Sequence, residues 1–360
     1  MAEAPHPAYG VFGEQPPPYP GEGFGFPPDG ATAPAPPSAR QSLIGRQNLV
    51  LIPLCRKGDR ANIEKQLQHG ANVGEVDLEG NTPLHVAVEA PKNEIATVQC
   101  LLEHSADPNA TNYIGAAPLH YVCLRKSNHR GIANILLENG AMVDGQTLAG
   151  KTALHFACEQ QMPELVEVFC MFAANTNLTD TEGNTPMHLA LIKEGGRDTV
   201  KRQIVEYLLS SRANCTHPNA QGWMPVHYAS RHGYTRCLQL LIEREADVSS
   251  PTARGETCLH LACQGGFTEV TQMLVQTTPQ NLNACDTNGN TPLHLCASHG
   301  TLECALILLR VGVNTELKNA QRQSAFDLAK IKGTDLNSNH NPELAQVLKE
   351  AQTKGGCRQS

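Results

Sequence analysis

Histidine and cysteine are the residues of this 360-residue chain whose types and spacing first suggest chemistry. Seven of the 15 histidines recur at regular intervals: His85, His120, His155, His188, His227, His260 and His294. Three of them are followed three residues later by a cysteine, and imidazole with thiolate is a typical zinc ligand set. A zinc site needs three or four ligands around one ion, however, and these pairs stand far apart in the sequence. The spacing therefore predicts neither a metal site nor a cofactor.

Catalytic motifs are absent from the same sequence. It contains no GxSxG nucleophile elbow, no phosphate-binding glycine loop and no metalloprotease helix motif. The 13 cysteines include no CxxC pair. We therefore expect a protein that is not an enzyme.

The histidines belong to a longer motif, which reads Gly-Asn-Thr-Pro-Leu-His at Gly80–His85 and again at Gly289–His294. From one motif histidine to the next the steps are 35, 35, 33, 39, 33 and 34 residues. A period of this length is typical of a solenoid built from stacked supersecondary units. Where a copy has threonine or proline before the leucine position, as at Thr82-Pro83, these residues predict a helix start, with the Thr hydroxyl capping backbone N–H groups and proline in the first turn.

A second helix follows each motif. After a short apolar stretch and a polar break come leucine pairs such as Leu101-Leu102 and Leu240-Leu241, and then a stop such as Asn139-Gly140-Ala141. Three breaks carry extra residues, at 89–93, 125–131 and 193–199, which we expect on the surface. The chain should therefore alternate two helices and a loop.

This pattern resembles the ankyrin repeat over residues 48–352. The resemblance implies an all-α ankyrin-repeat solenoid of helix–turn–helix repeats joined by β-hairpin loops. It implies seven full repeats from about 80 to 320, with degenerate caps at 48–79 and 321–352. It also implies that each motif histidine bonds the backbone and ties neighbouring repeats together. Residues 353–360 are expected to be disordered.

Binding of another protein is the function that such an array favours, because stacked repeats form a long concave surface. The hairpin tips vary from copy to copy, and aromatic residues and arginine dominate interface hot spots. The predicted partner-binding residues are therefore Tyr113, Ile114, Trp223, Arg254 and Arg322. Trp223, the single tryptophan, stands where other copies carry Asn, Ala, Lys or Glu, which predicts a solvent-facing side chain. Packing of Trp223 and Tyr113 on adjacent tips is an equally open interpretation.

The first 42 residues form a Pro/Gly-rich tail that should stay extended and disordered. Within it, Pro16-Pro17-Pro18-Tyr19 resembles the PPxY ligand of WW domains, with Pro16, Pro17 and Tyr19 as its key residues. A plain spacer is the alternative interpretation. Recruitment of a WW-containing ubiquitin ligase through Tyr19 stays open as well.

Two modification sites are candidates. Asn109 occupies the hairpin position that is hydroxylated in many members of the resembling family, while a simple turn-forming role is the alternative. The last four residues, from Cys357, have the outline of a C-a-a-X prenylation signal, but Arg and Gln replace its aliphatic pair.

Composition narrows the class of partner and the compartment. Hydrophobic residues make up 40% and charged residues 18%, as in a folded chain, and the net charge of −7 disfavours direct binding of nucleic acid. No run of about 20 apolar residues predicts a membrane span. Unpaired cysteines and the lack of a signal-like N-terminus predict a cytoplasmic or nuclear protein with intracellular protein partners.

Two more specific roles within this class remain open. Residues 257–300, with a lengthened hairpin at 276–283, are similar to the NF-κB inhibitors, which regulate transcription factors, although no Asp-Ser-Gly degron or acidic C-terminus accompanies them. A substrate adaptor of a ubiquitin ligase is the other role, although no leucine-proline box follows residue 330.

Overall fold

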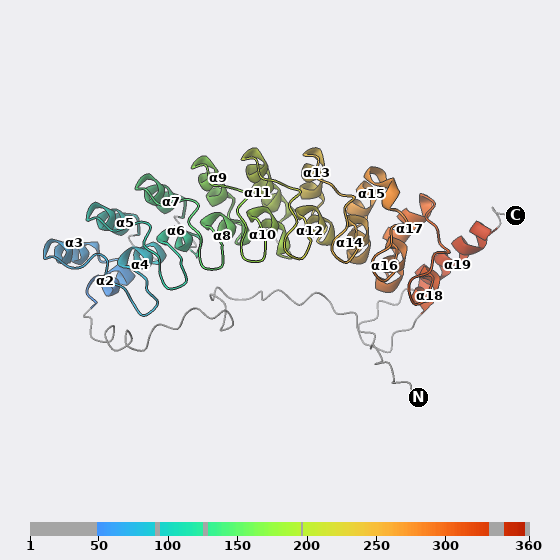
Figure 1. Ribbon diagram of the computed structural model, residues 1–360, viewed down its shortest axis with the longest axis horizontal. Coiled ribbons are helices and arrows are strands. Elements are labelled where there is room, and N and C mark those ends of the chain that lie inside the picture. The colour runs from blue at the N-terminus through green and yellow to red at the C-terminus, as the bar shows by residue number, and fades with distance from the viewer. Residues whose placement is uncertain (1–48, 91–93, 125–128, 196, 331–341, 357–360) are drawn as a thin grey trace, which may run out of the picture.

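A computed structural model describes residues 49–90, 94–124, 129–195, 197–330 and 342–356. Over these residues helices alternate in two layers along a curved rod (Figure 1). The predicted all-α ankyrin solenoid is confirmed.

The helices of the lower row in Figure 1 line the concave side. They are α2 (Leu51–Lys57), α4 (Pro83–Glu89), α6 (Pro118–Tyr121, continued by the 3-10 turn Val122–Leu124), α8 (Ala153–Glu159), α10 (Pro186–Ile192), α12 (Pro225–Arg231), α14 (Cys258–Gly265), α16 (Pro292–His299) and α18 (Ala325–Lys330).

The second helices form the upper, convex row. They are α3 (Arg60–Gln68), α5 (Glu94–Glu103), α7 (His129–Glu138), α9 (Pro163–Met171), α11 (Asp198–Ser210), α13 (Thr235–Glu243), α15 (Thr268–Thr277), α17 (Leu302–Arg310) and α19 (Pro342–Gly356).

Stacking of like helices creates the core. Each first helix packs against the first helices of the neighbouring repeats, and each second helix does the same in its own layer. Apolar side chains from both layers form one continuous buried cluster from Leu51 to Leu348. Because a single helix pair cannot bury its apolar face alone, this stacking explains why the motif must repeat.

The connecting loops are tight turns rather than β-strands. In the turn at Asp77–Asn81, the N–H of Asp77 donates to the carbonyl of Asn81 (3.0 Å) and Gly80 N–H donates back to Asp77 (3.1 Å). Across the described residues the one bridge of β type joins Lys318 and Ser324. The predicted hairpins are therefore present as hydrogen-bonded reversals.

Glycine is required at these turns by backbone geometry. Gly183 has φ +76, and a Cβ atom there would lie 2.8 Å from the backbone nitrogen of Ala220 in the next hairpin. Arg322 takes the equivalent left-handed conformation, with φ +62, in the last hairpin.

Both ends differ from the interior. At the first helix pair, which lacks the motif, the Glu75 carboxylate accepts the N–H groups of Val50 (3.1 Å), Leu51 (2.8 Å) and Ile52 (2.8 Å). A side chain from the following hairpin thus caps α2. At the other end α19 continues to Gly356, so residues 353–356 are helical and not disordered as predicted. Residues 357–360 lie outside the described residues.

The lengthened hairpin predicted at residues 276–283 takes another form. Helix α15 runs to Thr277, and a 3-10 turn follows at Pro279–Asn281. The additional residues therefore extend the second helix instead of the hairpin.

Candidate interaction groove

The motif histidines form a ladder of side-chain bridges between repeats. Their Nε2 atoms lie 2.9–3.1 Å from backbone carbonyl oxygens of the next hairpin, which belong to Ala116, Gly145, Asn184, Trp223, Ser250, Asn290 and Gln323 in chain order. Because a carbonyl oxygen can only accept, Nε2 carries the proton in each case. Each histidine therefore holds the following hairpin at a fixed height above its own helix.

The other ring nitrogen caps the helix that carries the histidine. At His85, Nδ1 accepts the backbone N–H of Thr82 (3.2 Å) and lies 2.9 Å from its hydroxyl oxygen. The imidazole thus takes the position that glutamate holds in an ordinary capping box. At Thr152, which alanine follows, the hydroxyl also accepts the N–H of His155 (3.4 Å). At the Thr-Pro starts of α4, α10 and α16 the threonine hydroxyl makes no such cap bond, and the histidine Nδ1 takes that role instead.

Burial keeps these imidazoles neutral. It lowers the pKa of His85, His155 and His188 from 6.5 to about 4, and backbone hydrogen bonds oppose the shift only in part. The neutral Nε2-protonated form is the one that can donate on one side and accept on the other. These histidines are therefore structural at neutral pH.

The hairpin tips are bonded to one another along the concave edge. Tyr113 N–H donates to Glu79 (3.2 Å), Leu148 to Ile114 (2.9 Å) and Thr181 to Ala149 (3.0 Å), all to backbone carbonyls. This ladder fixes the spacing of the variable tip residues.

Asparagine pairs reinforce the tips from within. Asn112 Nδ2 donates to Asn81 Oδ1 (2.8 Å) and to the Tyr121 hydroxyl (2.9 Å). Asn219 repeats this arrangement with Asn184 (2.9 Å) and Tyr228 (3.1 Å). The aromatic rings of both tyrosines are thereby held on the groove floor.

The centre of the groove combines aromatic rings with cations. The Trp223 ring lies 4.9 Å from that of Tyr228, centroid to centroid, and Arg231 Cζ lies 5.8 Å from the Trp223 ring centroid. Two repeats earlier, Lys151 Nζ lies 5.6 Å from the Phe156 ring and 3.0 Å from the Glu159 carboxylate. We call Trp223, Tyr228 and Arg231 the central cluster.

The structure distributes the predicted partner-binding residues along the hairpin edge and does not gather them at one point. Tyr113 is 42% exposed, Arg254 and Arg322 are exposed, and Ile114 is half-buried. Ile114 and Tyr121 line a hollow of about 320 Å³ together with Glu79 and Asn112.

Trp223 is half-buried, so the prediction of a solvent-facing side chain is wrong. Its ring reaches from the hairpin onto Tyr228 of its own repeat, whereas the alternative interpretation expected packing on an adjacent tip. The Arg231 guanidinium lies beside the ring, with Cζ 5.8 Å from the ring centroid.

Sequence reasoning missed the groove floor. Tyr228 and Arg231 lie five and eight residues after Trp223, and Phe156 and Glu159 have the same spacing from Lys151. Because this spacing places them on one face of the first helix, it could have identified them.

Lys201 was also missed, because its residue type suggests the surface. Its side chain is fully buried, and Nζ donates to the carbonyls of Lys193 (3.0 Å) and Ala190 (3.3 Å) while lying 4.7 Å from the Tyr234 ring centroid. Burial lowers its pKa to about 8. The ammonium group thus anchors the first part of the insertion at 193–199.

Asn109 lies in the loop between α5 and α6 and bridges two repeats. Its Nδ2 donates to Gly140 O (2.9 Å) and its Oδ1 accepts the N–H of Met142 (2.7 Å). Asn177 makes the same pair of bonds to Arg212 (3.3 Å) and Asn214 (2.7 Å), which sequence reasoning did not single out. Any enzyme that modifies Asn109 must first detach these bonds.

Several predicted features lie outside the described residues: the tail with Pro16, Pro17 and Tyr19, and Cys357 at the C-terminus. Among the residues with described placement, no group of three or more His, Cys, Asp or Glu could hold a metal ion. Burial raises the pKa of thiols such as Cys123 and Cys158, which accordingly behave as small apolar groups. No helix within the same ranges is long and apolar enough to cross a membrane.

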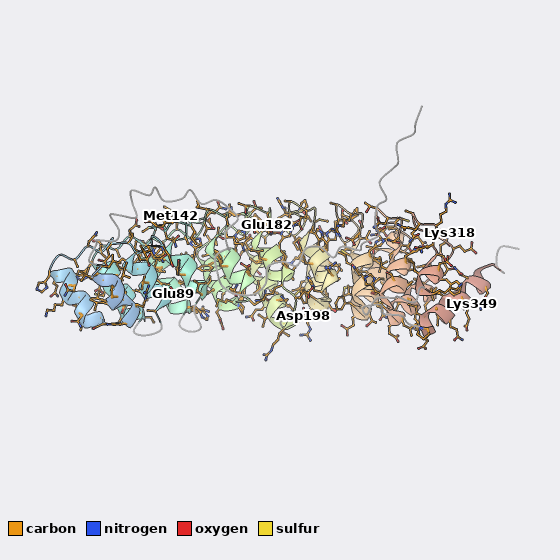
Figure 2. The ribbon with its side chains drawn as sticks, turned by 90° about the horizontal axis from the view of Figure 1, so that it is seen from below. Glu89, Met142, Glu182, Asp198, Lys318 and Lys349 are labelled. Atoms are coloured by element: carbon orange, nitrogen blue, oxygen red, sulfur yellow. The ribbon has the colours of Figure 1, made fainter. Side chains whose placement is uncertain are left out.

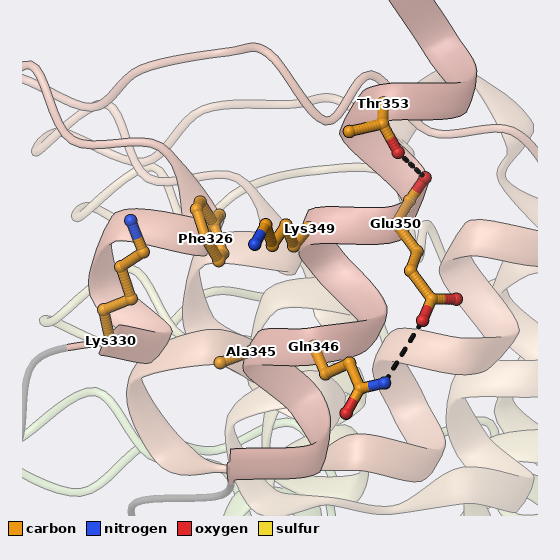
Figure 3. Close-up of a pocket in the computed structure, with 7 residues that line it drawn as sticks. All are labelled: Phe326, Lys330, Ala345, Gln346, Lys349, Glu350 and Thr353. Carbon is orange, nitrogen blue, oxygen red and sulfur yellow. Dashed lines mark hydrogen bonds between the residues drawn. The ribbon is translucent and has the colours of Figure 1, made fainter.

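A hollow of about 570 Å³ lies at the C-terminal end, between α18 and α19 (Figure 3). Lys330 Nζ lies 3.9 Å from the Phe326 ring centroid on one side, while Gln346 and Thr353 bond Glu350 on the other. In the interior of the array, the corresponding side of each helix pair is covered by the next repeat.

Paired helices, bridging histidines and bonded hairpins define a solenoid repeat protein with an open concave groove. The sequence matches the ankyrin-repeat family over residues 51–147, 142–219 and 226–319, and a second ankyrin description matches 202–242. The chain therefore belongs to the ankyrin-repeat family.

Curated relatives share the repeats over part of their length. The chain is 28% identical over 177 residues to human SH3 and multiple ankyrin repeat domains protein 2, which covers 49% of this chain and 7% of the relative. It is 28% identical over 174 residues to the Saccharomyces cerevisiae target of rapamycin complex 2 subunit AVO2, covering 48% and 31%. A 49-residue match to alpha-latroinsectotoxin-Lt1a of Latrodectus tredecimguttatus is 51% identical, covering 14% and 4%. The chain thus spans less than a third of each of these relatives.

Proposed function

We propose that this chain is a non-catalytic adaptor or regulator that holds a segment of another protein in its concave groove. The observation that carries the proposal is the central cluster, where a half-buried tryptophan, a buried tyrosine and an arginine meet on a rigid floor. Aromatic residues and arginine supply most of the binding energy in protein interfaces.

Rigidity of the groove supports this function. The histidine bridges and tip-to-tip bonds fix the positions of the hairpins before a partner arrives. A preorganised surface loses little conformational entropy on binding. The multi-domain and complex-subunit names of two relatives are compatible with an adaptor role.

Catalysis has little support, because the buried histidine and lysine side chains are already hydrogen-bonded within the fold. The motif histidines are neutral and bonded on both nitrogens, and Lys201 is bonded to two carbonyls. A general base or nucleophile would need a group that is free to reach a substrate.

Recruitment of a WW-domain protein through Pro16-Pro17-Pro18-Tyr19 is the second part of the proposal. A proline-rich segment of this kind enters an aromatic groove in an extended conformation. Binding of purified WW domains to the 12–24 peptide and to its Tyr19→Ala variant tests it, and equal affinities would exclude the motif.

A cytoplasmic or nuclear location is compatible with both proposed partners, the protein bound in the groove and the WW-domain protein. The cysteines within the described residues are free, which supports a reducing compartment. Fluorescence imaging of the tagged chain tests the location directly.

Proximity labelling in cells tests the groove. The full chain is compared with a variant that reverses two groove charges, Arg231→Glu with Arg254→Glu. The matched control reverses two exposed arginines of the convex layer, Arg236→Glu with Arg310→Glu. We expect the groove variant to lose a defined set of labelled proteins that the control retains. An unchanged set for the groove variant would show that partners bind elsewhere.

A further inference from the structure

The groove has an acidic first half. Exposed carboxylates of Glu79, Glu89 and Glu182 lie on the first four full repeats. In Figure 2, which views the molecule from below, Glu182 lies along the hairpin edge and Glu89 along the opposite edge. Lys151, which shares this half, is paired with Glu159 at 3.0 Å.

Arginines set the second half of the groove apart from the first. Arg254 and Arg322 are exposed on hairpins, and Arg231 is half-buried against Trp223. Two carboxylates, Glu256 and Asp286, lie among these arginines, and both are half-buried. An extended segment with one acidic and one basic end would therefore bind this groove in a single direction.

The position of α2 determines where the preceding segment leaves the array. First helices begin at the hairpin edge, and the Glu75 carboxylate holds the N–H groups of Val50, Leu51 and Ile52 there. The described chain therefore begins, at Leu49, near the acidic first hairpin, which carries Asp77 and Glu79.

The charges of residues 1–48 are arranged in the complementary order. Arg46 and Arg40 come nearest to the array. Farther from it are four carboxylates and no lysine or arginine, namely Glu3, Glu14, Glu22 and Asp29. Five aromatic residues accompany the carboxylates: Tyr9, Phe12, Tyr19, Phe24 and Phe26.

We propose that residues 1–48 of this chain occupy its own groove, with Arg40 and Arg46 at the acidic half and the segment from Glu14 to Asp29 at the arginine-bearing half beside Trp223. This inference depends on the proposed function in one respect: the segment would occupy the same groove surface that a partner protein would use.

Chain length permits this arrangement. From the first full hairpin to that of Trp223 there are four repeat steps, or roughly 40 Å at a helix spacing of about 10 Å. The residues between Glu22 and Leu49 can span up to about 90 Å when extended. The segment therefore reaches Trp223 with slack, and its aromatic side chains can meet the central cluster.

Competition between the tail and a partner follows. A tethered segment acts at high effective concentration, so it lowers the apparent affinity of the groove for other proteins. Because the docked segment contains Pro16–Tyr19, a WW domain and a groove partner would each favour binding of the other.

Fluorescence of the single tryptophan provides the test in the full chain, since Trp223 lies at the arginine-bearing half. One variant carries Glu14→Lys, Glu22→Lys and Asp29→Lys. The matched control carries the same change of charge on exposed ends of convex helices, as Glu103→Lys, Glu138→Lys and Glu243→Lys. Circular dichroism establishes that both variants keep the helical fold.

We expect the acrylamide quenching constant of Trp223 to rise about twofold in the tail variant and to stay unchanged in the control, with high salt producing the same rise in the wild type. Equal quenching constants for wild type and tail variant would overturn the proposal while leaving the groove available as a partner site. Shielding that appears only as protein concentration is raised roughly a hundredfold would also overturn it, because a second copy would then supply the tail.

Discussion

Replacement of His155 by alanine tests whether the histidine ladder holds the array together. His155 is fully buried, its Nδ1 accepts the N–H of Thr152 (3.1 Å), and its Nε2 donates to Asn184 O (3.1 Å). Alanine removes both bonds and leaves a cavity of imidazole size.

The magnitude can be built from these contacts. The Thr152 N–H is left buried without its partner, at about 1–3 kcal/mol, and loss of the second bond adds about 1 kcal/mol. Asn184 O suffers less, because the Asp180 N–H still donates to it (2.9 Å). The cavity contributes roughly 1–2 kcal/mol. The free energy of unfolding should therefore fall by about 4 kcal/mol, a large part of the roughly 5–15 kcal/mol typical of a folded chain.

Urea unfolding followed by circular dichroism measures this change. Because His155 joins the α8–α9 pair to the next hairpin, its loss should also broaden the transition or divide it into two steps. His217→Ala is the control, since His217 is exposed on a hairpin and should change stability by less than about 0.5 kcal/mol. A His155→Ala variant that unfolds at the urea concentration of this control would refute the bridging role.

Four further outcomes are expected. The free energy of unfolding should fall as pH is lowered from 6.5 to about 4, because the histidines of the unfolded chain bind protons in this range while His85, His155 and His188 of the folded chain, with a pKa of about 4, stay neutral. Each of the three should contribute roughly 3 kcal/mol. Urea titrations across this pH range measure the change, and a free energy that does not vary with pH would contradict it. Glu75→Gln should lower the stability of the first helix pair by about 1–2 kcal/mol, seen as faster hydrogen exchange in α2 and α3 alone. Arg322→Gly should raise stability by up to about 1 kcal/mol in thermal melts, since φ is +62 there; no gain would mean that the side chain compensates for the strain. Lys201→Met should cost about 1–2 kcal/mol by chemical denaturation, because the carbonyls of Ala190 and Lys193 lose a donor, and an unchanged midpoint would count against the anchor.

The fold could be predicted from the sequence because it repeats one local solution. A Thr-Pro helix start, a leucine pair and a glycine stop each specify a local conformation, and their recurrence requires stacking. The capping of α2 by Glu75 could not be predicted, because it depends on a contact 23–25 residues away in the sequence. The burial of Lys201 was equally hidden, since it depends on Tyr234 from the next repeat.

The candidate site was only partly predictable for a different reason. Tip positions were identified from their variability, but the sequence does not show how far each side chain reaches. Trp223 stands where Asn, Lys or Glu occur in other copies, and only its larger ring extends to Tyr228 on the helix below. Tyr228 and Arg231 belong to the groove because helix geometry places them beneath the tip, a relation that becomes visible once the hairpin height is known.

Stability and binding should be separable at Trp223 because its backbone is held independently of its ring. The N–H of Trp223 donates to Asn219 Oδ1 (2.9 Å), and its carbonyl accepts from His188 Nε2 (3.0 Å) and from Asn219 N–H (2.8 Å). Trp223→Ala leaves these bonds intact and removes the ring contacts with His227, Tyr228 and Arg231. The hairpin should therefore stay in place while the groove loses its largest apolar side chain. We expect recovery of the partner to fall strongly and the melting temperature to fall only slightly. If stability falls and partner recovery does not, the ring serves packing alone and the binding centre lies elsewhere along the groove.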